Sequence, residues 1–406
     1  MFIAGILLGA VAIFSPTQPV YAPPTAQFTI LDNNTGGDCA PGTGDIGKWN
    51  DKTKTCRLTD DLLGFSIVIG DDDITLNCDG HTLDGGVIGD SGIVVINQSF
   101  VTIKNCHVTG FTNGIFLQFA DNNTIKSNHL FENSAKGIRL NVSDENDVLG
   151  NDAHNNGDDG IKLSPQSDNN KIHGNTANDN DRDGIRLSSA SGNSIDGNTA
   201  NGNDIGISLS GSNSNTLNGN TANGNFFGIF LDVSNNNILS GNTANDNVFG
   251  GGIRLENSDF NLLDGNTADD NDGLGILLGN SDNNTLNGNN AIGNEGEGIS
   301  LSISNNNTLT GNTAKDNNNQ GIILQFSNNN TLTGNLAFKN SASGFLFFIT
   351  DDNTLEDNEA KNNGDFGFED DSGNTAATVL NKYFDNKCVA NGDGGSDPTG
   401  LCSPQN

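Results

Sequence analysis

The sequence predicts an all-β fold, a parallel β-solenoid of about 13 coils with three short strands per coil and a cap at each end. Three observations lead to this prediction: a repeat of about 23 residues, alternation of apolar and polar residues within each repeat, and columns of Asn that recur at the same period. Self-similarity at a fixed period of this length is the signature of a repeat architecture, in which each unit is one supersecondary element.

A Gly-Ile or Gly-Phe pair marks the start of each repeat. One unit, residues 206–227, contains three short pieces in which apolar and polar residues alternate: 207–209, 216–218 and 220–222. Alternation over so few residues is typical of short, half-buried strands, and the Asn, Gly and Ser between them are turn residues. Thirteen such pairs recur at intervals of 22 to 24 residues, beginning at Gly92, Gly114, Gly137, Gly160, Gly184, Gly206, Gly228, Gly252, Gly275, Gly298, Gly321, Gly344 and Gly367.

Stacking explains a composition that otherwise suggests disorder. Only 33% of the 406 residues are hydrophobic, and 18 Lys and Arg against 50 Asp and Glu give a formal net charge of −32. Such a composition is typical of unfolded chains. In the unit above, about four apolar side chains point inward: Ile207, Leu209, Leu217 and Ala222. A single coil cannot bury them alone, whereas coils stacked about 4.8 Å apart build one continuous core.

The chain contains 69 Asn, and many of them fall into three columns at the period of the repeat. Each column has eleven members, and the columns run from Asn123 to Asn353, from Asn128 to Asn358 and from Asn133 to Asn363. We expect stacked side-chain amides to hydrogen-bond along the axis, each donating to one neighbour and accepting from the other. Asn also tolerates the left-handed conformation that a sharp corner needs. The columns are therefore interpreted as structural.

The ends of the chain lack the repeat. Residues 1–22 are predicted to be a secretory signal peptide, because an apolar run (2–14) precedes a small-residue cleavage site, although no Lys or Arg precedes the run. A membrane anchor is the alternative for this segment. The remaining boundaries are an N-terminal cap over 23–64, β-helix repeats over 65–378 and a C-terminal cap over 379–406.

Six cysteines are an even number and allow fifteen pairings. Their positions suggest Cys39–Cys56, Cys78–Cys106 and Cys388–Cys402, which an oxidising compartment permits. We therefore expect a protein that is secreted, periplasmic or on the cell surface, without stable membrane insertion after processing. The acidic balance excludes a nucleic-acid binder, whose electrostatic footprint is positive. The oligomeric state stays open.

The repeat, together with residues 73–83 (DITLNCDGHTL), resembles the right-handed parallel β-helix proteins of the NosD type, within the pectin-lyase-like superfamily. The resemblance covers about residues 60–378. It implies a right-handed helix and an exported protein that acts on, or is displayed among, extracellular polysaccharides. The same solenoid carries many unrelated functions, so the fold alone assigns none of them.

The sequence lacks several catalytic and metal-binding motifs of this superfamily, which limits the activities that the resemblance implies. Alginate-epimerase relatives carry Asp-Pro-His, whereas the Asp-Pro here, at Asp397, is followed by Thr399. Pectin hydrolases carry Gly-His-Gly, whereas Gly80-His81 is followed by Thr82. The copper role attached to the NosD name also lacks support, since copper sites favour Met, Cys and clustered His. This chain has one Met, Cys expected in disulfides and five His that are spread along the sequence.

Charged residues interrupt the repeat over residues 137–187. The outward position of the Gly-Ile strand holds Arg139, Lys162 and Arg186 in three successive coils. Like charges that face each other on neighbouring strands are destabilising, so nearby carboxylates or a bound polyanion should compensate them. Candidate carboxylates stand just before the glycines of two of these coils: Asp158, Asp159 and Asp183.

This region is the candidate functional site. The favoured function is that of an exported protein that binds or handles extracellular polysaccharide, expected to be acidic, or forms part of the cell envelope. If the protein is instead a lyase or epimerase, a Lys or His would remove the proton beside a uronate carboxylate that Arg neutralises. In a hydrolase, two Asp would serve as acid and base. A purely structural, adhesin-like rod with a surface charge lattice is the further alternative. The candidate catalytic residues are Arg139, Lys162, Arg186, Asp158, Asp159, Asp183 and His154.

One segment also suggests a cation site. Asp179, Asp181 and Asp183 precede Gly184 in the pattern D-x-D-x-D-G, whose alternating oxygens and Gly turn suit Ca²⁺. The twelfth position is Ala190 rather than Glu, so the segment is not an EF-hand loop. Ca²⁺ is the one cofactor that the sequence suggests.

Overall fold

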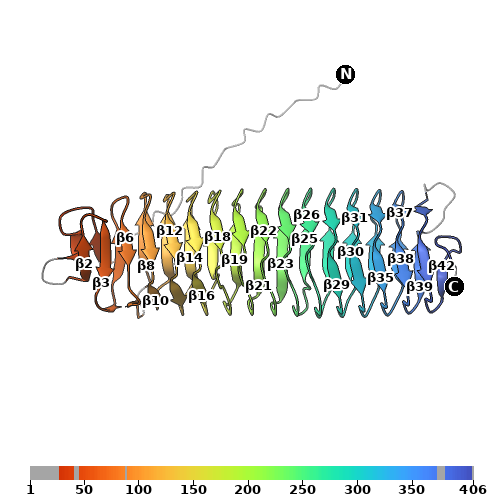
Figure 1. The fold of residues 1–406 in the computed structure, drawn as a ribbon, viewed down its shortest axis with the longest axis horizontal. Coiled ribbons are helices and arrows are strands. Elements are labelled where there is room, and N and C mark those ends of the chain that lie inside the picture. The colour runs from red at the N-terminus through yellow and green to blue at the C-terminus, as the bar shows by residue number, and fades with distance from the viewer. Residues whose placement is uncertain (1–26, 41–44, 87–88, 373–379, 405–406) are drawn as a thin grey trace, which may run out of the picture.

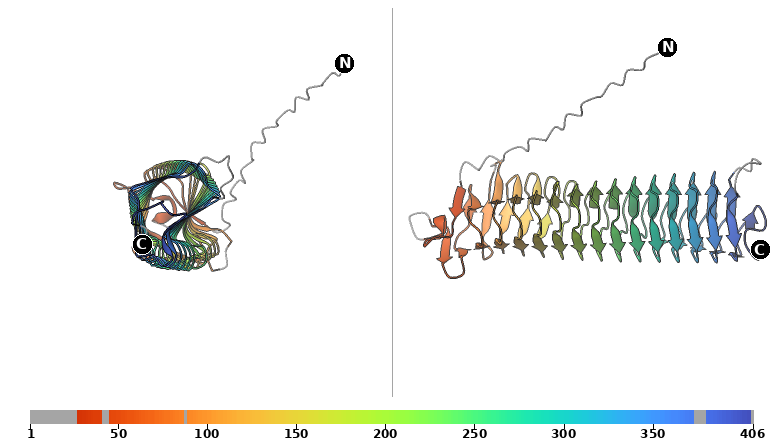
Figure 2. Two further views of the ribbon diagram at one scale, coloured as in Figure 1. Left: turned by 90° about the vertical axis from the view of Figure 1, so that its right-hand side faces the viewer. Right: turned by 90° about the horizontal axis from the view of Figure 1, so that it is seen from above.

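The computed structural model describes residues 27–40, 45–86, 89–372 and 380–404, so the predicted signal peptide lies outside the described residues. The described chain forms a straight rod of stacked coils (Figure 1). Viewed along its axis, the coils lie nearly on top of one another (Figure 2). The predicted parallel β-solenoid is confirmed.

Each coil contributes strands to three long walls, which we call sheets A, B and C. Sheet A has 16 strands, in this order along the rod: β1 (Gln27–Ile30), β5 (Ser66–Ile69), β8 (Ser91–Ile96), β11 (Asn113–Gln118), β14 (Lys136–Asn141), β17 (Ile161–Leu163), β19 (Asp183–Ser188), β21 (Ile205–Ser210), β23 (Phe227–Asp232), β25 (Ile253–Glu256), β27 (Ile276–Gly279), β30 (Ile299–Ser302), β33 (Ile322–Gln325), β36 (Phe345–Phe348), β39 (Phe366–Asp371) and β42 (Gly394–Asp397). The thirteen strands from β8 to β39 correspond to the thirteen predicted Gly-Ile or Gly-Phe pairs, and β1, β5 and β42 extend the sheet beyond them.

Sheet B runs beside sheet A and also has 16 strands: β2 (Gly47–Asn50), β3 (Thr55–Leu58), β6 (Thr75–Asn77), β9 (Thr102–Lys104), β12 (Thr124–Lys126), β15 (Asp147–Leu149), β18 (Lys171–His173), β20 (Ser194–Asp196), β22 (Thr216–Asn218), β24 (Ile238–Ser240), β26 (Leu262–Asp264), β28 (Thr285–Asn287), β31 (Thr308–Thr310), β34 (Thr331–Thr333), β37 (Thr354–Glu356) and β40 (Lys382–Phe384). Its first pair, β2 and β3, is antiparallel, whereas the following pairs are parallel.

Sheet C consists of two five-stranded segments. The first contains β4 (Leu62–Leu63), β7 (Thr82–Asp84), β10 (His107–Thr109), β13 (His129–Phe131) and β16 (Asp152–His154). The second contains β29 (Asn290–Ile292), β32 (Thr313–Lys315), β35 (Leu336–Phe338), β38 (Glu359–Lys361) and β41 (Lys387–Val389). Single bridges through a row of Thr, from Thr176 to Thr267, join the two segments. One short 3-10 helix, η1 (Gly37–Cys39), lies near the N-terminal end.

A continuous apolar core fills the rod. In the coil that starts at Gly206, the four side chains predicted to point inward (Ile207, Leu209, Leu217 and Ala222) are at most 1% exposed. Near the C-terminal end, Phe345 and Phe368 take the inward Ile position and stack with ring centroids 4.5 Å apart. Apolar alternation in the sequence therefore gives the correct inward face.

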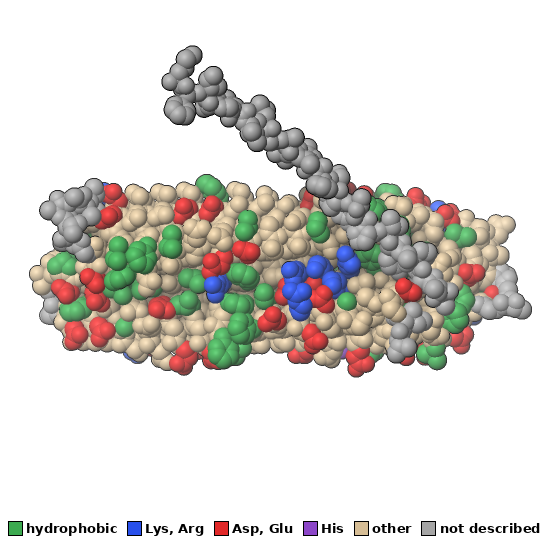
Figure 3. Space-filling model, turned by 180° about the vertical axis from the view of Figure 1, so that it is seen from behind, with side chains coloured by type: hydrophobic (Ala, Val, Ile, Leu, Met, Phe, Trp, Pro, Cys, Tyr) green, Lys and Arg blue, Asp and Glu red, His purple; other side chains and the backbone are tan. Residues whose placement is uncertain are grey.

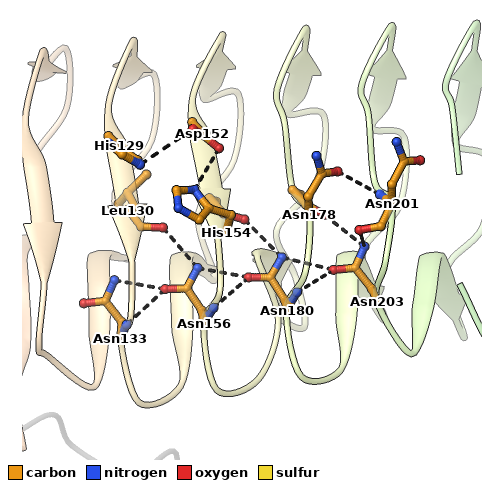
Figure 4. Close-up of polar contacts among 12 residues, drawn as sticks. His129, Leu130, Asn133, Asp152, His154, Asn156, Asn178, Asn180, Asn201 and Asn203 are labelled. Atoms are coloured by element: carbon orange, nitrogen blue, oxygen red, sulfur yellow. Dashed lines mark hydrogen bonds and ion pairs between the residues drawn. The ribbon is translucent and has the colours of Figure 1, made fainter. Parts of the chain in front are cut away.

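The Asn columns form hydrogen-bonded ladders. Asn220 accepts bonds from the backbone N–H and side-chain Nδ2 of Asn198 at 2.9 and 3.0 Å. Its own Nδ2 donates to the carbonyl of Ile195 at 2.8 Å and to Oδ1 of Asn242 at 2.9 Å. Four members of another column are joined along the axis in Figure 4. The predicted ladders are confirmed, and each amide also satisfies backbone groups.

The conformation predicted for these Asn is wrong. The left-handed residue at each corner is the one before the ladder Asn, as in Asn122, Ser127 and Glu132, with φ of 59°, 53° and 52°. The preceding residue turns the chain, so that the following Asn keeps ordinary backbone angles and points its amide inward. The corner position therefore tolerates several residue types, whereas the ladder position holds Asn in each coil from Asn123, Asn128 and Asn133 onward.

The ends of the ladders differ from the middle. All three predicted disulfides, Cys39–Cys56, Cys78–Cys106 and Cys388–Cys402, are present. Cys106 occupies the ladder position before Asn128, since its backbone N–H donates to Oδ1 of that Asn at 3.0 Å. At the other end, each column gains one more member: Asn381, Asn386 and Asn391. Within the described ranges, no helix is long and apolar enough to cross a membrane.

Candidate functional site

Three predicted cations lie in one row on sheet A. Arg139 on β14, Lys162 on β17 and Arg186 on β19 occupy matching positions of adjacent parallel strands. We call these three residues the cationic row. The face shown in Figure 3 carries a compact group of Lys and Arg side chains with carboxylates among them. Because strands are about 4.8 Å apart, the row presents a positive charge at that spacing along the rod axis.

Carboxylates stand beside the cationic row, as the sequence predicted. Asp159 is fully buried, with Oδ2 at 3.4 Å from Nζ of Lys162. Asp183 is also buried, and its Oδ2 lies 3.5 Å from Nη1 of Arg186. The Ser208 hydroxyl donates to that same oxygen at 2.5 Å. These ion pairs are compensation of the kind that like charges on adjacent strands require.

Sequence reasoning missed two cations of this group. Lys136, at the start of β14, pairs with Oδ2 of Asp158. Arg182, just before β19, places Nη1 at 3.4 Å from Oδ1 of the same carboxylate. Burial alone would raise the pKa of Asp158, but the hydrogen bond from Lys136 and the charges of both cations lower it below its ordinary value. The group thus contains five cations and three carboxylates in an otherwise acidic protein.

Burial leaves some of these charges incompletely paired. Nε of Arg139 and Nε of Arg186 are buried and have no hydrogen-bond partner among the described residues. The Arg139 guanidinium lies 5.3 Å over the ring of Phe116. Burial lowers the pKa of Arg139 and of Lys162, although the charge of Asp159 opposes both shifts.

The pKa of Asp183 is raised above the ordinary value of an Asp side chain. Burial raises its pKa to about 6, and the Asp159 charge adds to this, while the Ser208 bond and the Arg186 and Arg182 charges oppose it. Asp183 and Arg186 border a hollow of about 210 Å³ that also reaches Ser208 and the ring of Phe230. The arrangement puts Asp183, the cations Arg182 and Arg186 and the carboxylates of Asp204 and Asp232 around one small open space.

His154 lies away from the cationic row. It belongs to β16 in sheet C, and its Nδ1 is 3.1 Å from Oδ1 of Asp152 (Figure 4). His129, on the neighbouring strand, faces the same carboxylate. Of the seven candidate catalytic residues, six therefore gather on sheet A, and the seventh is part of a separate cluster.

The three candidate calcium ligands do not converge. Asp183 is buried against Arg186 and Ser208, whereas Asp179 and Asp181 are exposed. Among the described residues, one group of at least three His, Cys, Asp or Glu brings its ligand atoms within 4.8 Å of one another, and it is His129, Asp152 and His154. Calcium binding at residues 179–183 stays a prediction from the sequence.

The fold and the repeat define this chain as a right-handed β-helix protein. Three overlapping stretches, residues 91–244, 168–291 and 251–400, match the family model described as the right handed beta helix region. They cover well over half of the 406 residues, so the chain belongs to this family. The finer NosD-type grouping stays a prediction. Comparison with curated proteins found no match in sequence.

Several solved structures are similar in fold. The periplasmic alginate epimerase AlgG is 14% identical, with 84% of this chain and 78% of that chain covered and a TM-score of 0.44. The A-module of the Azotobacter vinelandii mannuronan C-5 epimerase AlgE4 is 14% identical, with 73% and 86% covered and a TM-score of 0.42. The Dettilon tailspike protein is 15% identical, with 79% and 62% covered and a TM-score of 0.44. Likenesses this distant carry no argument about the site or its substrate.

Proposed function

We propose that this chain binds an acidic polysaccharide along sheet A, with the cationic row contacting carboxylate groups of the polymer. The observation that carries the proposal is the row itself: three cations in register on adjacent parallel strands. Guanidinium groups match carboxylates in geometry and form charge-assisted hydrogen bonds with them.

A polymer fits this surface better than a small molecule. The hollow beside Arg186 measures about 210 Å³, below the roughly 300–1,000 Å³ typical of small-molecule sites. The charges recur along a straight face rather than converge in a cavity.

We further propose that the protein works outside the cytoplasm. Its three disulfides are typical of exported proteins. The signal peptide predicted from the sequence agrees with this location.

The test is binding to immobilised polymers. The chain from residue 23 onward should be retained on polygalacturonate and alginate but not on neutral dextran, and added salt should weaken the retention. The buried carboxylates Asp159 and Asp183 pair with Lys162 and Arg186 rather than with Arg139, so Arg139→Ala should leave the fold unaffected. We expect its affinity to fall about 10- to 100-fold, as for loss of a charged hydrogen bond.

Arg254→Ala is the matched control. Arg254 holds the same position in a later coil, but its guanidinium is paired with Glu256 at 2.6 Å. This variant should bind as the unchanged chain does. Equal retention on dextran, or an Arg139→Ala variant that binds normally, would refute polysaccharide recognition by the cationic row.

Catalysis on the same polymer is the second candidate, and Asp183 is the observation that favours it. A carboxyl group with a pKa of about 6 can act as general acid or base near neutral pH. A lyase or epimerase would use it with Arg186 beside the uronate, and a hydrolase would use it with a second Asp.

Incubation with polyuronides separates the two candidates. A catalyst should release shortened or unsaturated products, or change the uronate composition, and Asp183→Asn should abolish this while polymer binding persists. Asp264→Asn, a change of an exposed carboxylate on β26, is the control and should retain activity. Binding without any product would leave the protein as a non-catalytic binder.

A further inference from the structure

Sheet C contains a second departure from the repeat. Its outward row reads Thr82, His107, His129 and Asp152, and it then continues as Thr from Thr176 to Thr267. Beyond Thr267 the row varies and reads Asn290, Thr313, Leu336, Glu359 and Lys387, so the fold tolerates several residue types at this position. The earlier coils differ in that residue types that bind metals, two His and an Asp, follow one another in the row.

Parallel register brings three metal-binding side chains together here. His129 on β13 lies directly opposite Asp152 on β16, and His154 follows two residues later on the same strand and the same face. Nε2 of His129 is 3.7 Å from Oδ2 of Asp152, and Nδ1 of His154 is 3.1 Å from Oδ1 (Figure 4). The ligand atoms of the three side chains all lie within 4.8 Å of one another.

The surroundings hold these groups in place and leave a ligand atom unused. Nε2 of His129 is buried without a hydrogen-bond partner among the described residues. The ring of Phe131 stacks on His154 at 5.9 Å and packs against His129 at 4.7 Å, which forms an apolar wall on one side. His107, next in the row, places its ring 5.3 Å from that of His129.

We propose that His129, Asp152 and His154 form a binding site for a divalent transition-metal ion such as Zn²⁺. Imidazole and carboxylate are ligands that zinc and related ions prefer, and three protein ligands leave a coordination position open for water. Calcium prefers oxygen ligands, so it should not compete at this site. The inference is independent of the polysaccharide function, because it rests on a different sheet and on different residues.

Zinc titration of the chain from residue 23 onward tests the site. In a background of Ca²⁺, which occupies non-specific acidic sites, isothermal titration calorimetry should show one saturable Zn²⁺ per chain. NMR should shift or broaden the ring signals of His129 and His154 and leave those of His81 and His173 unchanged. Loss of a direct ligand should weaken binding more than about 100-fold, since outer-shell partners alone cost 10- to 100-fold.

The variants are His129→Ala and His154→Ala, with His173→Ala as the matched control. His173 is an exposed His on β18 in sheet B, outside the cluster, and its variant should bind Zn²⁺ normally. Unchanged circular dichroism would show that all variants fold. The proposal is overturned if the unchanged chain has no saturable site, or if the double variant His129→Ala and His154→Ala binds Zn²⁺ as tightly as the unchanged chain.

Discussion

Two stretches of the same rod share the same core and Asn ladders but differ in the side chains on the outward row of sheet A. Between β14 and β19, the outward row of sheet A holds Arg139, Lys162 and Arg186 with buried carboxylates beside them. From β21 onward, Arg254 is the single cation of that row, which reads Ser208, Phe230, Arg254, Leu277, Ser300, Ile323, Leu346, Glu369 and Asp397. The Asn ladders continue unchanged beneath both stretches.

The comparison separates fold from function within one molecule. The later coils show that the solenoid needs apolar inward residues and amide ladders, and that it needs no run of adjacent cations on sheet A. The charges of the earlier coils are therefore an addition to the framework, with desolvation costs that the fold alone does not justify. Four predictions test or refine this distinction.

The largest expected effect is loss of a ladder amide. Asn220→Ala would leave several buried groups without partners, among them the Asn198 backbone N–H and the Ile195 carbonyl. At about 1–3 kcal/mol for each unsatisfied group, the free energy of unfolding should fall by about 4–6 kcal/mol. Asn218→Ala, an exposed change in the same coil, should alter it by no more than about 0.5 kcal/mol. Chemical denaturation measures both, and equal effects would contradict the ladder account.

The next effect concerns the N-terminal end, where a disulfide replaces an amide pair. Replacing Cys78 and Cys106 together by Ala opens a loop with a sequence separation of 28. The free energy of unfolding should fall by about 3–4 kcal/mol, as expected for a loop of this length. The denaturation midpoint of the double variant measures this. A midpoint equal to that of the unchanged chain would show that the first coils do not depend on the disulfide.

Asp183→Asn should stabilise the protein in a pH-dependent way. The folded pKa of about 6 lies above the ordinary value of 3.8, so ionisation of Asp183 disfavours the folded state. The favourable contribution of protonated Asp183 to the free energy of unfolding is complete below about pH 4 and is lost as the pH rises through 6. The variant should therefore match the unchanged chain at pH 4 and exceed it by about 3 kcal/mol at pH 7.5. Denaturation at the two pH values is the measurement, and a difference that does not depend on pH would contradict the burial argument.

The smallest effect on the free energy of unfolding is expected for replacement of Arg254. Its guanidinium lies 5.5 Å over the ring of Phe227 and pairs with Glu256 at the surface. Exposed pairs and cation–π contacts contribute about 1 kcal/mol or less. Arg254→Ala should change the free energy of unfolding by no more than that, as measured by denaturation. A larger loss would mean that isolated outward cations also support the fold.

The fold could be predicted because its information repeats. Each coil repeats the same alternation of apolar and polar residues, so an ambiguous assignment in one coil is resolved by the next. The spacing of the Gly residues fixes the strand register. The columns end too early in the prediction because the spacing from Asn353 to Asn381 is 28 residues rather than about 23. The turn conformation was assigned to the wrong residue, since the sequence does not say which of two adjacent polar residues bends the chain.

The candidate site could be predicted only in part. The cationic row could be predicted because its residues share one position of the repeat. The pairing of Lys136 and Arg182 with Asp158 could not, because it depends on the conformations of the long Lys and Arg side chains near the strand ends. The histidines looked spread because 22 to 25 residues separate His107, His129 and His154. His107, His129 and Asp152 hold matching positions in three successive coils, and His154 follows Asp152 by two residues, so a signal was present in the third strand. Aligning the repeats by this strand as well would have revealed the cluster.

The most direct test of the central claim converts the first stretch into a copy of the second. Removing the cations alone would leave buried carboxylates unpaired, so their partners must change as well. The combined variant is Arg139→Ser, Lys162→Ser, Arg186→Ser, Asp159→Asn and Asp183→Asn. Its affinity for immobilised polygalacturonate or alginate is the measurement, with the denaturation midpoint recorded in parallel. We predict that binding falls more than about 100-fold, beyond the loss of one charged contact, while stability is unchanged or higher. Undiminished binding by a folded variant would contradict the assignment of polysaccharide recognition to the cationic row.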